Sequence, residues 1–502
     1  MGWASVWMEV SRISGKSPKD RLQWAKVAFL KHFRARLMVR SILAGLMVPL
    51  VLSFLLVLSQ VMAFAQAPEV EWQKTFGGSG HDIGSSVKQT LDGGYIIAGW
   101  TESFGEGMSD IYLLKTDASG ELIWQRTFGG SGEDNAQAVQ NTSDGGYIIV
   151  GHTFSFGSGD PDVYLLRTDT FGQLIWQRTF GGSGWDWGYS VQQTSDGGYI
   201  IVGWTDSFGA GEGDVYLIKT DPSGNLVWQR TFGGSKFDSG SSVQQTSDGG
   251  YIIVGWTQSF GAGSSDIYLL KTDASGQLIW QTTFGGSSGE VGFSIQQTSD
   301  GGYIILGYTL SFGQGGYDVY LVKTNSTGSL IWQKSFGGSG DEGGASVCRT
   351  ADGGYIVAGW TDSFGAGEGD VYLIKTDPSG NLVWQRTFGG SKVDTGNFVQ
   401  QTTDGGYIIA GWTSSFGAGE TDVYLTKLGP EGPAEDILPP SLIQDFNASD
   451  GENGQSTLCW TNPSDDDLAQ VIVRRKTDGY PSDHTNGDLV YQDTSPTPGA
   501  LG

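Results

Sequence analysis

The sequence predicts an all-β protein whose main domain, residues 70–428, is a seven-bladed β-propeller. A D-G-G-Y motif recurs seven times at intervals of 52 residues, with no insertion between copies. Glycine is abundant, at 81 of 502 residues, and aromatic residues make up 12% of the chain. Many short strands joined by glycine-rich turns are typical of propellers. No repeat shows the 3.6-residue periodicity of an amphipathic helix.

Each repeat contains four predicted strands. In one copy they cover residues 190–194, 199–205, 214–220 and 225–232. Asp-Gly and Ser-Gly turns between them supply the positive φ angles that tight hairpins need. The third strand is apolar without alternation, as expected for a strand covered on both faces, and each sheet of a propeller is covered by its two neighbours.

The two ends of the repeat region complement each other. Residues 70–76 form a lone strand of the fourth type, whereas the last repeat stops after its third strand, 422–428. We therefore expect strand 70–76 to complete the seventh blade. The ring then has four antiparallel strands in every blade and no open edge.

The N-terminal residues 1–65 are expected to be a secretory signal peptide. Residues 41–62 are apolar and uncharged, basic residues precede them, and Ala63–Ala65 provide a small-residue cleavage site. The basic leader is long, so Met38 is an alternative start. The protein is then secreted or held at the cell surface. In the alternative reading the segment is an uncleaved anchor, because 22 apolar residues can span a bilayer.

The C-terminal part carries a second resemblance to a known module. Residues 429–441 are rich in proline, glycine and acid, which predicts a linker. Leu442–Phe446 and Leu458–Trp460 resemble the first two strands of a fibronectin type III module. Such a sandwich needs seven strands and about 100 residues. Residues 442–502 are therefore expected to form an incomplete module, a partial β-sandwich.

Composition excludes several classes of protein. A net charge of −25 argues against binding to nucleic acid, and against membrane contact beyond the N-terminal segment. The two cysteines and four histidines form no metal or redox motif, and no hydrolase or phosphate-loop motif is present. An active site needs unlike groups that converge, whereas near-identical repeats place the same groups around a ring. We expect a monomeric propeller that is not an enzyme and has no cofactor.

The repeat resembles the bacterial SBBP-type β-propeller repeat family. The matching residues are Gly181–Gly188, with the pattern GGSGxDxG, and Asp196–Thr205. This resemblance implies an extracytoplasmic propeller and no particular ligand. Lys219–Gly224, which lead to Trp228, are also similar to the tryptophan-docking motif of quinoprotein propellers. Those enzymes have eight blades, so we interpret this likeness as shared packing.

A binding site is expected where the repeats differ. The most distinctive stretch contains Trp185, Asp186, Trp187 and Tyr189, and the next repeat extends it with Lys236, Phe237 and Asp238. Aromatic rings beside a carboxylate can stack on a sugar or hold a protein partner. The alternative is simple packing between adjacent loops.

One acidic position recurs in all seven repeats. It is occupied by Asp82, Asp134, Asp186, Asp238, Glu290, Glu342 and Asp394. Oxygen-rich loops suit calcium, so a ring of calcium sites is one hypothesis. The other is turn capping, in which each carboxylate accepts backbone N–H bonds.

These patterns favour a recognition or adhesion platform that binds an extracellular glycan or protein through one propeller face. The alternative is a structural scaffold without a ligand, and a hydrolase, lyase or quinoprotein-like enzyme is less favoured. Divergent charged residues along the central channel would indicate an enzyme. A uniform lining would indicate a platform.

Overall fold

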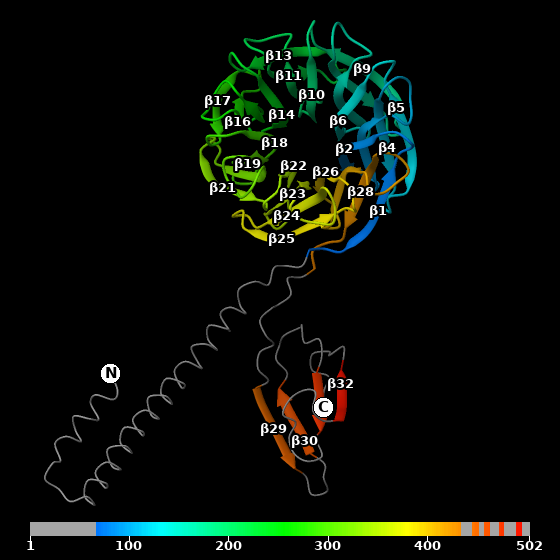
Figure 1. Ribbon diagram of the computed structural model, residues 1–502, viewed down its shortest axis with the longest axis vertical. Coiled ribbons are helices and arrows are strands. Elements are labelled where there is room, and N and C mark those ends of the chain that lie inside the picture. Colours follow the sequence, from blue (N-terminus) through cyan, green and yellow to red (C-terminus); the bar gives the residue numbers. More distant parts are fainter. Residues whose placement is uncertain (1–66, 433–443, 451–455, 462–470, 476–487, 494–502) are drawn as a thin grey trace, which may run out of the picture. The chain divides into compact units, whose positions relative to one another are not determined.

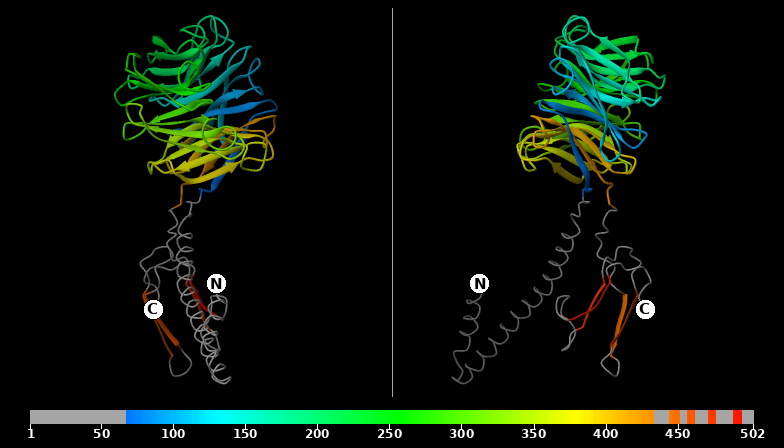
Figure 2. Two further views of the ribbon diagram at one scale, coloured as in Figure 1. Left: turned by 60° about the vertical axis from the view of Figure 1, so that its left-hand side comes forward. Right: turned by 90° about the vertical axis from the view of Figure 1, so that its right-hand side faces the viewer.

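The computed structural model describes residues 67–432 and four strands between residues 444 and 493. Residues 67–432 form a seven-bladed β-propeller, as predicted, with seven four-stranded antiparallel sheets around a central axis (Figure 1). Figure 2 shows the same ring of blades from two further directions.

The strands of each blade are ordered from the central channel outward. The first strands are β2 (Asp82–Gln89), β6 (Asp134–Asn141), β10 (Asp186–Gln193), β14 (Asp238–Gln245), β18 (Glu290–Gln297), β22 (Glu342–Arg349) and β26 (Asp394–Gln401). The second strands are β3 (Tyr95–Thr101), β7 (Tyr147–Thr153), β11 (Tyr199–Thr205), β15 (Tyr251–Thr257), β19 (Tyr303–Thr309), β23 (Tyr355–Thr361) and β27 (Tyr407–Thr413). The third strands are β4 (Asp110–Thr116), β8 (Asp162–Thr168), β12 (Asp214–Thr220), β16 (Asp266–Thr272), β20 (Asp318–Thr324), β24 (Asp370–Thr376) and β28 (Asp422–Leu428). The fourth strands are β5 (Leu122–Phe128), β9 (Leu174–Phe180), β13 (Leu226–Phe232), β17 (Leu278–Phe284), β21 (Leu330–Phe336), β25 (Leu382–Phe388) and, for the last blade, β1 (Val70–Phe76).

The first strand of each blade is longer than predicted. In the third blade it begins at Asp186 rather than at Ser190, because a β-bulge between Gly188 and Ser190 lets the pairing with β11 continue. Asp186 lies opposite Thr205 at the end of this ladder. Residues expected in a connecting loop therefore belong to the strand that lines the channel.

Ring closure follows the predicted arrangement. Strand β1 pairs antiparallel with β28, and the sheet order is β1-β28-β27-β26. A second link joins the two ends, since the backbone N–H of Asp82 donates to the carbonyl of Thr421 over 2.9 Å. The N-terminal strand thereby completes the last blade.

The hydrophobic core lies between neighbouring blades. In the layer between the first two blades, Leu113 faces Ile149 and Leu166, and all three are fully buried. The fourth-strand tryptophan of each blade packs against the second-strand tyrosine of the next, as in Trp72 and Tyr95, whose ring centroids are 5.8 Å apart. Burial on both sides of every sheet explains the unbroken apolar runs of the third strands.

The C-terminal strands form a separate unit. Strand β29 (Gln444–Asp450) pairs with β30 (Ser456–Thr461), and β31 (Val471–Arg475) pairs with β32 (Asp488–Asp493), both antiparallel. The predicted signal peptide, residues 433–441 of the linker and the remainder of 442–502 lie outside the described residues. Within the described part, no helix has the length and apolarity to cross a membrane.

Candidate functional site

The seven first strands surround a central channel of about 950 Å³. Each first strand carries a β-bulge at the same position, such as the one between Gly188 and Ser190. A bulge places two residues where the partner strand has one, so Tyr189 and Ser190 both line the channel. The bulges therefore increase the number of side chains that each blade presents to the axis.

One position of the first strands differs between all seven repeats. The position after the recurring acidic residue holds a different residue in every blade, namely Ile83, Asn135, Trp187, Ser239, Val291, Gly343 and Thr395. By contrast, one buried position of the third strand holds tyrosine in every blade, namely Tyr112, Tyr164, Tyr216, Tyr268, Tyr320, Tyr372 and Tyr424. The chain therefore keeps this framework position constant and varies a position of the strands that surround the channel.

A ring of mostly aromatic residues from the second strands surrounds one mouth of the channel. We call these residues the aromatic ring, and they are Trp100, His152, Trp204, Trp256, Tyr308, Trp360 and Trp412. All are half-buried except His152, which is buried. Each lies opposite the variable position of its own first strand, as Trp204 lies opposite Trp187.

On the third and fourth blades the aromatic residues form a continuous series of ring contacts. Trp187 lies parallel to Trp185, with planes 6° and centroids 6.3 Å apart, and stacks on Trp204 at 6.4 Å. Phe237 continues the series, 4.9 Å from Trp204 and 5.0 Å from Trp256. We call these five residues the aromatic array. Flat apolar rings gathered at a cavity mouth are typical of ligand-binding sites.

Polar groups beside the aromatic array could fix the orientation of a ligand. The indole Nε1 of Trp204 donates to the hydroxyl of Tyr189 over 3.1 Å. Burial raises the pKa of Tyr189, so its hydroxyl stays protonated at neutral pH. The indole N–H of Trp187 is buried and has no partner among the described residues. A buried donor without an acceptor is unfavourable, and a ligand oxygen would satisfy it.

The structure brings together four of the seven predicted site residues. Trp187, Tyr189 and Phe237 line the channel, and Trp185 lies beside them with 41% of its surface exposed. The remaining three lie elsewhere. Asp186 and Asp238 are fully buried and face away from the channel lining, and Lys236 is exposed on the loop before β14.

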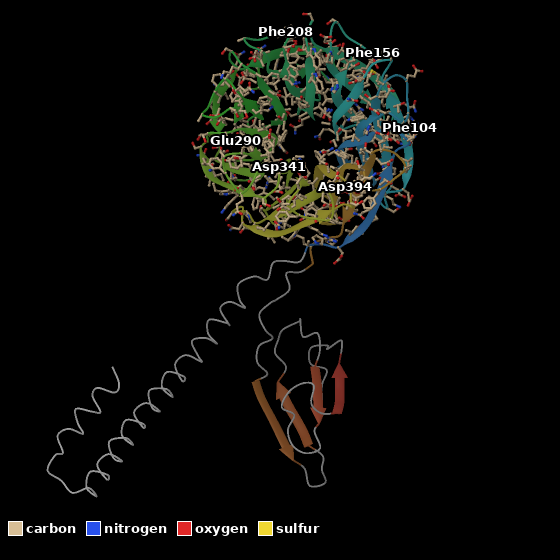
Figure 3. The ribbon with its side chains drawn as sticks, in the orientation of Figure 1. Phe104, Phe156, Phe208, Glu290, Asp341 and Asp394 are labelled. Atoms are coloured by element: carbon tan, nitrogen blue, oxygen red, sulfur yellow. The ribbon has the colours of Figure 1, made fainter. Side chains whose placement is uncertain are left out.

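The recurring carboxylates accept hydrogen bonds from the loops at the mouth of the channel. Asp186 accepts the backbone N–H of Gly182 over 2.8 Å and the hydroxyl of Ser207 over 2.6 Å. Glu290, labelled in Figure 3 with Asp394, similarly accepts the N–H of Gly286. This geometry agrees with turn capping. No group of three or more histidine, cysteine or acidic residues within the described ranges could hold a metal ion, and calcium stays a prediction.

A second buried carboxylate lies close to each of these. Gly181 separates Asp162 of one blade from Asp186 of the next, and a Cβ added to this glycine would lie 1.8 Å from Asp162 Oδ1 and 2.6 Å from Asp186 Oδ2. Burial, and then the charge of Asp186, raise the pKa of Asp162. Two like charges therefore oppose each other across the boundary between blades.

The lining fits neither of the two patterns expected from the sequence. It is divergent at some positions, but Lys88 is the only charged side chain among the described residues that form it. The sequence reasoning overlooked Lys88, the aromatic ring and Phe398, all of which lie at or near the axis. A position-by-position comparison of residues 82–89 with their counterparts would have revealed the divergence.

The comparisons with known proteins add little about function. No family model matches the chain. A stretch of 156 residues is 27% identical to the regulatory protein FlaEY of Caulobacter vibrioides, and the match covers 26% of this chain and 16% of that protein. This chain therefore spans only a small part of that relative's length.

Several solved structures are similar to this chain at low identity and with TM-scores below 0.5. The WD40 domain of Neurospora crassa Pan2 is 11% identical, with a TM-score of 0.43, and the match covers 71% of this chain and 91% of that one. A Dyadobacter fermentans protein of unknown function is 12% identical, with a TM-score of 0.42 and coverages of 72% and 99%. Sqt1 of Chaetomium thermophilum is 13% identical, with a TM-score of 0.40 and coverages of 69% and 83%. A likeness at this level carries no information on ligand or activity.

Proposed function

We propose that this protein is an extracellular recognition module that binds an oligosaccharide at the aromatic mouth of its channel. One observation carries the proposal. Two of the positions at which the repeats differ most, those of Trp187 and Tyr189, lie in the first strands that surround the channel, and a third, that of Trp185, belongs to the aromatic array beside it. Variation among the residues of a concave surface is expected when that surface binds a ligand.

The chemistry of the lining favours a sugar. The array offers flat apolar faces, which match the C–H faces of a sugar ring. The serine and glutamine side chains deeper in the channel, such as Ser190 and Gln192, donate and accept hydrogen bonds to hydroxyl groups. Glycoside hydrolysis requires a pair of carboxyl groups, and the channel-lining residues among those described include none. Binding without catalysis is therefore the role we propose.

Several sequence features support the extracellular location. Residues 41–65 have the features of a secretory signal, and the repeats resemble the SBBP-type family, which implies an extracytoplasmic propeller. The fibronectin-like segment after residue 442 would act as a spacer. An uncleaved anchor at 41–62 would leave the propeller outside the cytoplasm as well.

A protein partner is the second candidate. Trp185 and Phe154 lie edge to face on the rim, with centroids 5.9 Å apart, and both are substantially exposed. Exposed aromatic pairs of this kind frequently anchor protein interfaces. A scaffold with no ligand would leave both the exposed pair and the divergent lining unexplained.

A glycan array with the purified chain tests the proposal. We expect saturable binding that is lost in the Trp185→Ala/Trp187→Ala double variant. Phe171→Ala is the matched control, because Phe171 is also exposed, at 68%, but does not line the channel. Repeating the array with and without calcium tests the calcium hypothesis. Absence of binding to any glycan would contradict the proposal and favour a protein partner.

A further inference from the structure

Lys88 has an unusual position within the channel. Among the lining residues, all of which belong to the described part of the chain, it is the only charged side chain. The equivalent positions of the other blades hold Gln140, Gln192, Gln244, Gln296, Cys348 and Gln400. Five of the seven blades thus have a glutamine where the first blade has a lysine.

Four of the five glutamines at this position, those other than Gln140, accept a backbone N–H of the next blade. The side-chain oxygen of Gln192 accepts the backbone N–H of Gln245 over 2.6 Å, and that of Gln244 accepts the N–H of Gln297 over 2.6 Å. A protonated lysine has no acceptor atom, so Lys88 cannot make the corresponding bond to its neighbour Asn141. Lys88 therefore lacks the hydrogen bond between blades that glutamine makes at this position. A contribution to folding stability does not explain why lysine is present here.

The surroundings of Lys88 do not neutralise its charge. Its Nζ lies 4.4 Å from the centroid of the Phe398 ring, and no described residue offers it a carboxylate or a hydrogen-bond acceptor. Burial lowers the pKa of Lys88 to about 8, an effect that the charge of Cys348 partly opposes, and the amine is still mostly protonated at neutral pH. Lys88 is half-buried, and a charged group that is partly removed from water and has no carboxylate partner is less stable than one in bulk water.

Phe398 differs from its counterparts too. The equivalent residues of the other blades are small, namely Ser86, Ala138, Ser190, Ser242, Ser294 and Ser346. Two neighbouring blades have thus diverged together at the same depth of the channel. The aromatic face partly stabilises the ammonium and leaves its other sides open to the cavity.

We propose that Lys88 binds a single negative charge on the ligand, so that the channel takes an acidic oligosaccharide. This inference rests on the proposed function and adds the ligand class. One ammonium balances one carboxylate or one sulfate monoester, whereas a phosphate monoester carries about −1.5 to −2 at pH 7. The sugar rings would lie on the aromatic array, and the acidic group would lie deeper, at Lys88.

The dimensions call for a chain of several sugar units. Trp187 occupies the first channel-facing position of its strand, and Lys88 occupies a position five residues further along the equivalent strand. Five residues of a β-strand span roughly 17 Å, and the bulge shortens this somewhat. A monosaccharide cannot reach both groups.

The acidity of the protein does not prevent this binding. The net charge of −25 acts mainly through exposed groups, whose field is screened beyond about 8 Å at physiological salt. The recurring carboxylates at the mouth are buried and do not line the channel. At short range, Lys88 is the charge that an anionic group meets.

An array of paired oligosaccharides tests the inference with the full chain. Each uronic-acid member and each sulfated member is printed beside its neutral counterpart. We expect binding to acidic members, with the carboxylate and sulfate series showing which anion is preferred. The Lys88→Gln variant carries the residue of five sister repeats, so the fold is preserved. Its affinity for acidic members should fall roughly 10- to 100-fold, the usual effect of losing a hydrogen bond to a charged group.

Lys392→Gln is the matched control, because it removes one exposed lysine outside the channel lining. It should bind like the unaltered chain. Equal binding to acidic and neutral members, unchanged in Lys88→Gln, would overturn the inference. The proposed function would survive that result provided the Trp185→Ala/Trp187→Ala variant still lost binding. Failure to bind any saccharide would overturn both.

Discussion

The imidazole of His152 stacks on the indole of Trp187 across the boundary between the second and third blades, with centroids 3.8 Å and planes 26° apart. His152 is the smallest member of the aromatic ring, and Trp187 is the largest residue at its own variable position. The smaller ring leaves space for the larger one. The second and third blades therefore differ from the other blades in complementary ways at the mouth of the channel.

His152 should make stability depend on pH. Burial lowers the pKa of His152 to about 4, whereas an unfolded histidine titrates near 6.5. Between these values the unfolded chain binds a proton that the folded chain does not. The contribution of neutral His152 to the free energy of unfolding is therefore complete above pH 6.5. It falls by up to about 3 kcal/mol as the pH decreases to 4.

Urea unfolding of His152→Gln beside the unaltered chain measures this contribution. Other groups titrate equally in both proteins, so the difference between the two pH profiles isolates His152. We expect the profiles to approach each other as the pH falls from 6.5 to 4. Parallel profiles over this range would contradict the assigned pKa.

The carboxylate pairs between blades should weaken the fold at neutral pH. In Asp162→Asn the amide can still accept the N–H of Ser158, which donates to Asp162 over 2.7 Å, and it can donate to Asp186. We expect a gain of about 1 kcal/mol at pH 7, the usual scale for one buried interaction. Because the raised pKa means that Asp162 is already protonated in acid, the gain should vanish below about pH 4.

Asp160→Asn is the control for this gain. Asp160 lies two residues away but is exposed, so its replacement changes the net charge without changing a buried pair. Thermal melts of the two variants at pH 7 provide the comparison. A loss of stability in Asp162→Asn would show that the charge is needed, as it would be if a cation lay between the carboxylates.

Glu431 should stabilise the closed ring. Its Oε1 accepts the hydroxyl of Tyr407 over 2.6 Å and the indole N–H of Trp384 over 3.2 Å. Glu431→Ala leaves both buried donors without this acceptor, at a cost of about 1–3 kcal/mol in the free energy of unfolding. Glu420→Ala removes an exposed pair with His81 and should change stability by less than about 1 kcal/mol. Equal losses of stability for Glu431→Ala and Glu420→Ala in urea unfolding would contradict a stabilising role of Glu431.

Strand β1 should be required for a closed monomer. Removing residues 67–76 exposes the edge of β28 and uncovers the cluster against which Trp72 and Phe76 pack. Open strand edges promote association between chains. We expect a lower melting temperature and concentration-dependent association in light scattering. A monomeric truncated chain that melts like the intact one would contradict the closure.

Much of the fold could be predicted because the same turn motif and strand pattern recur in every repeat. Seven copies of one turn fix the strand boundaries, and the lone strand 70–76 fixes the closure. The start of β10 was missed, since the alternation of its side chains is broken by the bulge at Gly188. A one-residue insertion of this kind is hard to distinguish from a loop in the sequence.

The candidate site was predictable only in part. Trp185, Trp187 and Phe237 stand out because their repeats differ from the rest. In the structure Trp185 contacts Trp187, and Phe237 contacts Trp204 of the same array. Lys88 and Phe398 are 310 residues apart in the sequence, and ring closure alone brings them together. Whether an aspartate binds a ligand or caps a turn depends on its burial, which no motif records.

A crystal structure of the chain with its best-binding oligosaccharide tests the central claim most directly. The account predicts a sugar ring stacked on the aromatic array between Trp187 and Phe237, with the chain continuing into the channel towards Lys88. A saccharide bound on the outer strands, or one that leaves the channel empty, would contradict it.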